Sequence, residues 1–426
     1  IRVASFRVDS PDVQVCRSDG SGMSASLKGL ALEGVSWDST LLKLGSVHME
    51  SPVADIYSGH FLDTLQNQTK LGSVDLYTAL EKVAGRIFLG RFSLKDANIR
   101  YAYYGKSDSL QHQKLDTTNL FIEGLAVDTR LRTYKLDDIR FSTRNLELPL
   151  DNGFYTLKVG AVDLTGSSVV IDRIRLISPY PKMQFAYLQP HHKDWFDVSV
   201  GQVALAGIDL STYLSEKVLR IADVQVSDAV LQNFKNQKIP IPRRIVPMIY
   251  TGLQKAPVKL DFQRVGIKNF SVVYEELAKK GTVPGKLFFT DMNGTFTGFT
   301  NIVSRPDQYI VLDADGKLMG KGNFTATWKL PVDSLNDRFL LNARLDSFDL
   351  TALNELQSGW VREMAFSTEA SSKGATVEMV FLYNGLKAAL LKEKDGVLTD
   401  KKFLTGLVNR VLKQNNPDKT GKGFNK

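Results

Sequence analysis

Cysteine and long apolar runs are nearly absent from this sequence, and both absences limit what the chain can be. Among 426 residues only Cys16 is a cysteine, so no disulfide can form within the chain. No apolar run reaches about 18 residues, so no transmembrane helix is expected within it. The chain begins with IRVASFRV, in strand-like alternation and without a charged leader. We therefore expect a fragment whose natural N-terminus, with any anchor, has been removed.

Basic charge is confined almost entirely to the C-terminal tail. The net charge is +8, and residues 401–426 hold seven Lys or Arg and one Asp, so the other 400 residues are nearly balanced. A nucleic-acid-binding protein carries a basic stripe with interleaved aromatic residues, and the sequence has no such stripe. We therefore expect no nucleic-acid partner.

Motifs for catalysis, metals or cofactors are missing or stand in the wrong context. GSGMSA at 20–25 has dinucleotide-like glycine spacing, but strand-like residues follow it where a helix is required. His191 and His192 lie in a polar stretch without further ligands at metal-binding spacing. Adjacent acids such as Glu275 and Glu276 face opposite ways on a strand. The sequence therefore predicts no enzyme and no cofactor.

One short unit returns along the chain. It consists of an apolar-x-apolar segment, two to four polar or small residues, and a second apolar-x-apolar segment. The first four copies start about 41 to 47 residues apart, which is typical of a repeat array. The polar centre fits either a tight turn or a bulge inside one long strand, and the sequence does not decide between them. The copies occupy 5–15, 46–57, 91–104, 138–150, 161–171, 223–234 and 265–276.

Residues 265–289 show the alternation most clearly, with apolar side chains at every second position before and after a Pro-Gly turn. That spacing is typical of antiparallel strands with one apolar face, which helices, a second sheet or closure into a barrel can cover. The helical segments are too few and too short to cover so many strands. A sandwich or a closed barrel is an alternative, but the regular repetition favours one elongated, twisted antiparallel sheet curled into an open groove.

Few segments show helical spacing. Short helices are expected at 75–85, 211–217 and 350–357, and within a proline-rich seam at 239–257. The segment LTDKKFLTGLVNRVLKQ predicts an amphipathic helix that either caps the end of the sheet or lies on an anionic membrane surface. Its apolar stripe consists of Phe403, Leu404, Leu407, Val408, Val411 and Leu412.

The stretch at 265–301 reads VGIKNFSVVYEELAKKGTVPGKLFFTDMNGTFTGFTN: an alternating strand, a Tyr-Glu-Glu, a Pro-Gly, and a long strand ending in Thr-Asn. This stretch resembles the late region of AsmA-like bacterial envelope proteins. Further stretches resemble that family in order, at 155–181, 198–214, 374–392 and 402–417. The resemblance covers most of the chain from about residue 137 onward.

The resemblance implies a repeating β-groove protein of the bridge-like lipid-transfer type. Members of the family are usually anchored in the inner membrane of a two-membrane bacterium by an N-terminal helix, and they project into the periplasm. They are implicated in phospholipid transport between membranes and in outer-membrane biogenesis. Periplasmic localisation, membrane anchoring and a phospholipid partner are therefore expectations that rest on the resemblance.

The apolar face is expected to hold acyl chains without covalent chemistry, as in a non-enzymatic lipid carrier. A dry core between two sheets is the alternative use of the same residues. The alternative function is a structural or assembly factor that recruits envelope proteins through its sheet edges. The residues expected to line the groove are Phe270, Val272, Tyr274, Leu287, Phe289, Val377, Met379 and Phe381.

These patterns divide the chain into four expected parts. The first two are β-groove repeats at 1–238 and the proline-rich seam with a short helix at 239–257. The others are a C-terminal AsmA-like β-groove segment at 258–397 and the amphipathic helix with its basic tail at 398–426.

Overall fold

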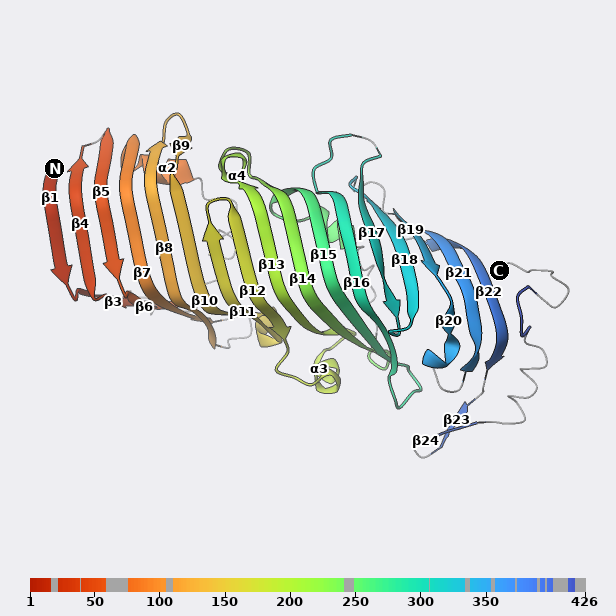
Figure 1. Cartoon of the computed structure of the whole chain (residues 1–426). Helices are drawn as coiled ribbons and strands as arrows, with labels where there is room; N and C mark the ends of the chain where they lie inside the picture. The colour runs from red at the N-terminus through yellow and green to blue at the C-terminus, as the bar shows by residue number, and fades with distance from the viewer. Residues whose placement is uncertain are drawn as a thin grey trace. The chain divides into compact units, whose positions relative to one another are not determined.

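Strands make up 72% of the computed structural model and helices 8%, as the scarcity of helical spacing predicts. Over the described residues, 22 strands form one large twisted sheet that does not close into a barrel (Figure 1). The expected mainly-β, open fold with few helices is confirmed, although the sheet is mixed rather than purely antiparallel. The structure describes residues 1–16, 22–38, 40–58, 76–104, 110–240, 249–305, 307–333, 338–353, 357–371, 374–388, 391–394, 397–400 and 413–417.

The chain divides into two compact units, which are described separately. Unit 1 is Ile1–Tyr180 with Val198–Ala222, and unit 2 is Pro181–Asp197 with Asp223–Lys426, so β13 and β14 contribute residues to both. The elements up to α4, apart from α3, are β1 (Arg2–Asp9), β2 (Asp12–Cys16), β3 (Gly22–Ser26), β4 (Gly29–Trp37), β5 (Leu41–Glu50), β6 (Val53–Ser58), α2 (Leu76–Glu81), β7 (Arg86–Tyr104), β8 (Leu110–Asp128), β9 (Thr133–Lys135), β10 (Asp138–Leu150), the 3₁₀ turn η1 (Asp151–Gly153), β11 (Tyr155–Thr165), β12 (Ser168–Ile177), β13 (Trp195–Asp209) and α4 (Leu210–Glu216). The remaining elements are α3 (Lys182–Leu188), β14 (Val218–Asn236), α5 (Ile249–Gln254), β15 (Lys259–Leu277), β16 (Gly285–Thr300), β17 (Tyr309–Leu318), β18 (Gly322–Pro331), β19 (Arg338–Leu345), β20 (Phe348–Asp349), the 3₁₀ turn η2 (Leu350–Ala352), β21 (Gln357–Ser371), β22 (Gly374–Ala388) and the separate pair β23 (Leu391–Lys394) and β24 (Val397–Asp400).

The helices agree only in part with the sequence expectations. α2 and α5 lie inside two of the expected segments and α4 overlaps a third, although it begins one residue earlier, whereas only the short turn η2 forms in the described part of 350–357. α3 lies in a stretch for which the alternation predicts no helix. The expected C-terminal helix, with its stripe from Phe403 to Leu412, falls outside the described residues.

The polar centre of the repeat is a kink in six of the seven copies: it lies inside one strand in four of them and between two consecutive strands, β1 and β2 or β5 and β6, in the other two. Each kink places one non-glycine residue at positive φ, a conformation that is uncommon for side chains with a Cβ. In the copy at 161–171 the centre is instead the turn of the β11–β12 hairpin, at Gly166. The six kinked residues are Ser10, Ser51, Asp96, Asn145, Asp228 and Asn269.

The kink at Asn269 explains a change in the apolar alternation along β15. Before the kink the apolar positions are odd, as at Val265 and Ile267, and after it they are even, as at Phe270 and Val272. The pairing of β15 with β16 shifts register over the same residues. An extra residue in a strand moves the following side chains by one position, so the apolar residues stay on one face.

Two short helices lie in crossovers between parallel strands. In unit 1, β5 and β6 run parallel to β7, with Leu41 opposite Arg86, and α2 lies in the connection. In unit 2, Arg264 binds Asp223 at 2.9 Å across a separation of 41 residues. Asn269 binds Asp228 across the same separation, as expected for parallel β14 and β15 with α5 in their connection. Parallel neighbours require such crossovers.

The most buried side chains of unit 2 gather near the ends of strands rather than at mid-sheet. One cluster packs Ile310 and Leu330 against Leu253 of α5. A second cluster forms around Phe348, beside η2. A third packs Phe234 of β14 against α3. These clusters fix the margins of the sheet, and Trp328, Phe324 and Phe381 of its apolar face pack against them.

Candidate functional site

One face of unit 1 carries an unbroken row of apolar side chains. Residues directly opposite each other on neighbouring strands share a face, and the pairings connect one apolar residue from each of nine strands. All nine are half-buried, and no second layer of described residues seals them. We call them the apolar row of unit 1: Val8, Leu30, Met49, Leu94, Leu120, Phe141, Leu164, Val169 and Leu205.

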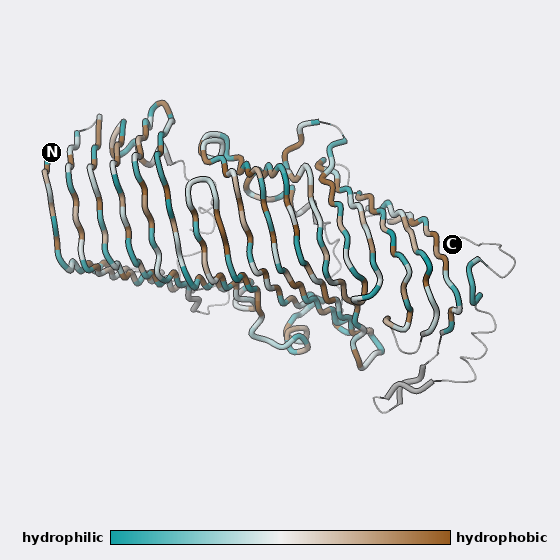
Figure 2. Tube along the Cα trace, in the orientation of Figure 1, coloured by the Kyte–Doolittle hydropathy of each residue, from teal (hydrophilic) through white to brown (hydrophobic). Residues whose placement is uncertain are grey.

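The opposite face of unit 1 is largely polar. The positions next to the apolar row, one residue away on each strand, face the other way. The pairings connect them in a second row: Arg7, Ala31, His48, Ser93, Phe121, Arg140, Thr165 and Ser168. Ala31 and Phe121 are the two apolar residues of this row, and Phe121 is covered by the Arg140 guanidinium, 5.0 Å from its ring centre. Brown and teal accordingly alternate along the strands in Figure 2. Unit 1 therefore presents one apolar and one polar face.

Unit 2 has a different apolar face, with a row of small residues at its centre. Gly294, Ala314, Ala326 and Ala343 lie opposite one another on β16 to β19. We call these four residues the alanine row, which Phe366 and Met379 continue onto β21 and β22. Two positions away on either side run rows of larger side chains, including Leu312, Trp328 and Leu341, and Phe324, Leu345 and Phe381.

Because small and bulky rows alternate, the apolar face of unit 2 is uneven in height. Bulky rows on both sides of small residues leave a furrow that crosses the strands. The clusters around Ile310 and Phe348 lie beyond the two bulky rows and do not include the alanine row. The furrow is therefore bordered by packed side chains but, within the part of the chain that is described, is not filled by them.

The eight predicted lining residues lie on this same face. In β15, Phe270, Val272 and Tyr274 lie opposite Met292, Phe289 and Leu287 of β16. Phe289 in turn lies opposite Leu318 and packs edge-on against the Phe324 ring at 5.5 Å. In β22, Val377, Met379 and Phe381 lie opposite Thr368, Phe366 and Met364.

Sequence reasoning missed the alanine row and the apolar row of unit 1. The signal for the alanine row is a small residue between two polar ones, as in DAD at 313–315, TAT at 325–327 and NAR at 342–344. Such triplets alternate like any exposed strand. Only the strand register reveals that their central residues share one row.

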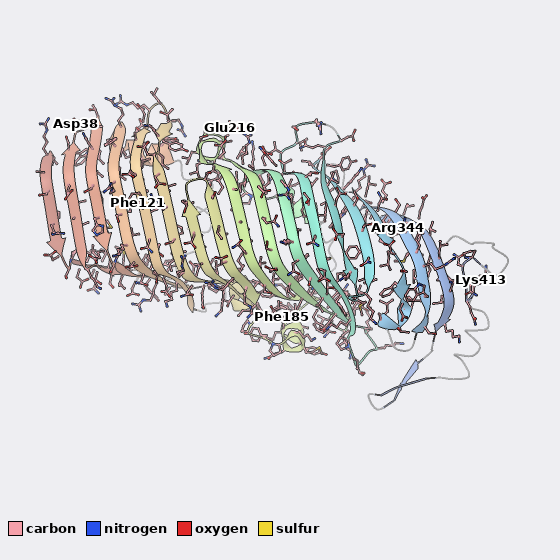
Figure 3. The ribbon with its side chains drawn as sticks, in the orientation of Figure 1. Asp38, Phe121, Phe185, Glu216, Arg344 and Lys413 are labelled. Carbon is pink, nitrogen blue, oxygen red and sulfur yellow. The ribbon has the colours of Figure 1, made fainter. Side chains whose placement is uncertain are left out.

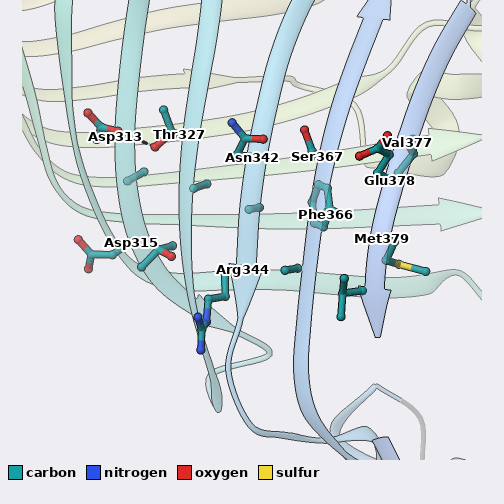
Figure 4. Close-up of a pocket in the computed structure, with 16 residues that line it drawn as sticks. Asp313, Asp315, Thr327, Asn342, Arg344, Phe366, Ser367, Val377, Glu378 and Met379 are labelled. Atoms are coloured by element: carbon teal, nitrogen blue, oxygen red, sulfur yellow. Dashed lines mark hydrogen bonds between the residues drawn. The ribbon is translucent and has the colours of Figure 1, made fainter. Parts of the chain in front are cut away.

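A hollow of about 1040 Å³ lies over β17, β18, β19, β21 and β22 (Figure 4). It is lined by the alanines and by the polar residues on both sides of them, such as Asp313, Asp315 and Arg344. Its lining also includes Phe366, Val377 and Met379 of the apolar face, so residues of both faces border the hollow. Asp313 accepts a 2.7 Å hydrogen bond from Thr327 there.

Polar groups gather where β15 ends. Glu275 pairs with Lys182 of α3, and Glu276 accepts hydrogen bonds from the Tyr274 hydroxyl and from Gln237. Both acids thus have partners, rather than being simply solvated at a strand end. Burial, the hydrogen bond to Glu276 and that carboxylate's negative charge together raise the pKa of Tyr274.

The histidine pair forms no metal site with described residues. His192 Nε2 lies 3.2 Å from Asp194 Oδ1, a contact that becomes an ion pair when the imidazole is protonated. Across the described residues, no three His, Cys, Asp or Glu side chains come together in a group that could bind a metal ion.

The end of the chain that is described touches β22. Asn416 is buried and exchanges main-chain hydrogen bonds with Tyr383, with N–O distances of 2.9 and 3.1 Å. The Asn416 side-chain amide also donates to the Phe381 carbonyl at 2.6 Å. Residues 413–417 therefore occupy part of the outer edge of this strand.

Comparison with known proteins adds no identity to this geometry. No family model matches the chain, and no curated protein matches it. Within the described ranges, every helix is too short or too polar to cross a membrane. The fold and the site define a mainly-β protein with one open twisted sheet and apolar rows that lie across its strands.

Proposed function

We propose that this chain is a non-enzymatic carrier that holds the acyl chains of phospholipids along the apolar rows of its sheet. What supports the proposal is the apolar row of unit 1, which extends over nine strands and stays half-buried. Contiguous apolar surface of this extent usually marks a binding site. Each square ångström of apolar surface removed from water contributes about 25 cal/mol of favourable free energy. Binding of an acyl chain along such a row is therefore favourable.

The chemistry required of the protein is limited to binding. Acyl chains present no hydrogen-bonding groups, so a row of Leu, Val, Met and Phe side chains suits them at any position along it. Lipid head groups would stay at the margins, where polar side chains such as Glu276 and Gln237 lie. No cofactor and no covalent step are part of this function.

The cellular setting is a proposal of the same kind. The order of AsmA-like stretches from about residue 137 onward supports a periplasmic lipid-transport protein of a two-membrane bacterium, anchored in the inner membrane. Its contribution would be to phospholipid transport between membranes and to outer-membrane homeostasis. The competing function is an envelope assembly factor that binds proteins through its sheet edges and carries no lipid.

Photo-crosslinking tests the lipid proposal directly. Benzoylphenylalanine at Leu120 or Leu341 places the probe on an apolar face, and the matched controls at Phe121 and Asn342 place it on the opposite face. We expect crosslinks to phospholipid in cells at the first two positions and not at the controls. Equal labelling at all four positions, or labelling by protein alone, overturns the proposal.

A second test fills the furrow of unit 2. Ala326→Trp adds a large ring between Ala314 and Ala343, whereas the control Thr325→Trp adds the same ring to the opposite face. We expect less phospholipid to copurify with Ala326→Trp and no change with the control, while both variants keep their strand content by circular dichroism. An unchanged lipid content in Ala326→Trp contradicts a role for the furrow.

A further inference from the structure

Three segments of unit 2 meet at one end of its strands. α3 and the loop after it, residues 236–240, and residues 277–286 between β15 and β16 are held together by main-chain hydrogen bonds. Gln237 N donates to Leu277 O at 2.9 Å, and His192 N donates to Pro240 O at 2.8 Å. We call residues 181–194, 236–240 and 277–286 the loop end of unit 2; α3 marks its place in Figure 1, and Phe185 its place in Figure 3.

The loop end rests on buried aromatic and aliphatic side chains. Phe185 of α3 is fully buried, and Ala186 packs against Phe234 and Leu277. Lys182 of α3 lies 5.4 Å from the centre of the Phe234 ring and also pairs with Glu275. These contacts hold α3 against the strand ends, so the loop end is a packed surface.

The acidic and basic side chains of this surface differ in their exposure to solvent. The nearby acids are partly buried and have partners: Glu275 pairs with Lys182, Glu276 accepts from Gln237, and Asp194 contacts His192. No exposed acid occurs in the three segments. The exposed charges are the lysines Lys238, Lys279, Lys280 and Lys286, together with Lys193.

Large apolar side chains project beside these lysines. Tyr187 is 59% exposed and Leu188 48% exposed at the end of α3, and Val283 is 64% exposed in the loop between β15 and β16. Exposed apolar tips surrounded by lysines are the combination that binds an anionic bilayer, because lysines meet the phosphates while the apolar tips enter the head-group layer.

We propose that the loop end of unit 2 docks onto the surface of a membrane that contains anionic phospholipid. The apolar side chains of β15 after its kink, from Phe270 to Tyr274, lead to this end of the strand. Docking here therefore places the bilayer beside the apolar face, and this consequence rests on the proposed function. The docking itself depends only on the lysines and the apolar tips.

Vesicle co-sedimentation of the full chain tests the docking. We expect the protein to sediment with vesicles of phosphatidylcholine and phosphatidylglycerol, to stay in solution with phosphatidylcholine alone, and to be released by high salt. Lys279→Glu/Lys280→Glu should weaken binding by about tenfold or more. Lys321→Glu/Lys329→Glu, with the same net charge but elsewhere on unit 2, should bind as the wild type does.

Val283→Asp separates membrane docking from attraction by charge alone. We expect it to weaken vesicle binding at unchanged stability, since Val283 is exposed. Equal binding by Val283→Asp and the wild type, an equal loss in both charge variants, or no binding by the wild type overturns the docking proposal. The lipid that copurifies with Lys279→Glu/Lys280→Glu separates the two proposals. If this variant no longer docks but carries lipid at the wild-type level, the carrier function stands without docking. If the protein docks but carries no lipid, the carrier function is wrong and docking stands alone.

Discussion

The side-chain oxygen of Asn119 accepts a hydrogen bond from the main-chain N of Asp96 at 2.9 Å, and so joins the kinks of β7 and β8. The Asn119 amide group also donates to the carbonyl of Thr117, which is the positive-φ residue of its own strand. Asn293 makes the same two contacts in unit 2, with Asn269 N at 3.1 Å and with the Asp291 carbonyl. In both pairs, an asparagine two residues after the kink of one strand accepts a hydrogen bond from the main-chain N–H at the kink of the neighbouring strand.

Asn119→Ala removes the acceptor for the Asp96 N–H. A partly buried donor left without a partner costs about 1–3 kcal/mol, so the free energy of unfolding of unit 1 should fall by roughly that amount. Urea unfolding followed by circular dichroism measures the change. Asn323→Ala, at an exposed strand position, is the control and should change stability by less than about 0.5 kcal/mol; an equal loss in both contradicts the role of the kink contact.

The kinks show how far the fold could be predicted from sequence. The alternation predicts the strands and one apolar face, and the change from odd to even positions at Asn269 follows from a bulge. A tight turn gives the same local pattern, as it does at Gly166. The choice depends on whether the next strand continues the first or returns beside it, and that depends on contacts distant in sequence. The parallel pairings of β7 were missed for the same reason.

Val272→Asp places a carboxylate on the apolar face, directly opposite Phe289. A charge in an apolar binding site carries a desolvation cost, so copurifying phospholipid should fall by about tenfold or more. Ser271→Asp, one residue away and on the opposite face, is the matched control and should keep its lipid. Mass spectrometry of the extracted lipid measures both. Loss of strand content in Val272→Asp without any bound lipid in the wild type points to the assembly-factor alternative.

The candidate site was predictable where one strand carries the pattern by itself. Phe270, Val272 and Tyr274 alternate within β15, and their shared face follows from the sequence. The alanine row has one residue from each of several strands, so no single stretch contains it. Its position follows from strand register, which side-chain packing and turn geometry determine.

Phe185→Ala should destabilise the loop end of unit 2. Phe185 is fully buried, and truncation of such a ring costs about 3–5 kcal/mol through lost burial and the cavity left behind. Tyr187→Ala on the same helix removes an exposed ring and should change stability by less than about 0.5 kcal/mol, while it weakens vesicle binding. Denaturant unfolding and co-sedimentation measure the two effects. A stable Phe185→Ala variant contradicts the packed anchoring of α3.

The raised pKa of Tyr274 predicts a loss of stability at high pH. In the unfolded chain this hydroxyl ionises near pH 10, whereas in the folded chain it keeps its proton to higher pH because it is partly buried and donates to Glu276. The contribution is therefore fully present below about pH 10 and declines as pH rises toward the folded-state pKa. Tyr274→Phe should show a shallower decline between about pH 9 and 11. Denaturant midpoints measured over that range decide the matter, and parallel declines in the two proteins contradict the prediction.

Asn416→Ala should release residues 413–417 from the edge of β22. The substitution removes the 2.6 Å hydrogen bond to the Phe381 carbonyl, although the main-chain bonds to Tyr383 can still form. Since Asn416 is buried, the carbonyl left without this donor costs about 1–3 kcal/mol of local stability. Amide exchange at Tyr383 should therefore quicken by about fivefold or more, while exchange at positions in β18 stays unchanged. Gln414→Ala keeps the main-chain bond from Leu386 N to Gln414 O and is the matched control. If Tyr383 exchanges at the wild-type rate in Asn416→Ala, the side chain does not hold this segment, and the main-chain pairing with β22 is sufficient by itself.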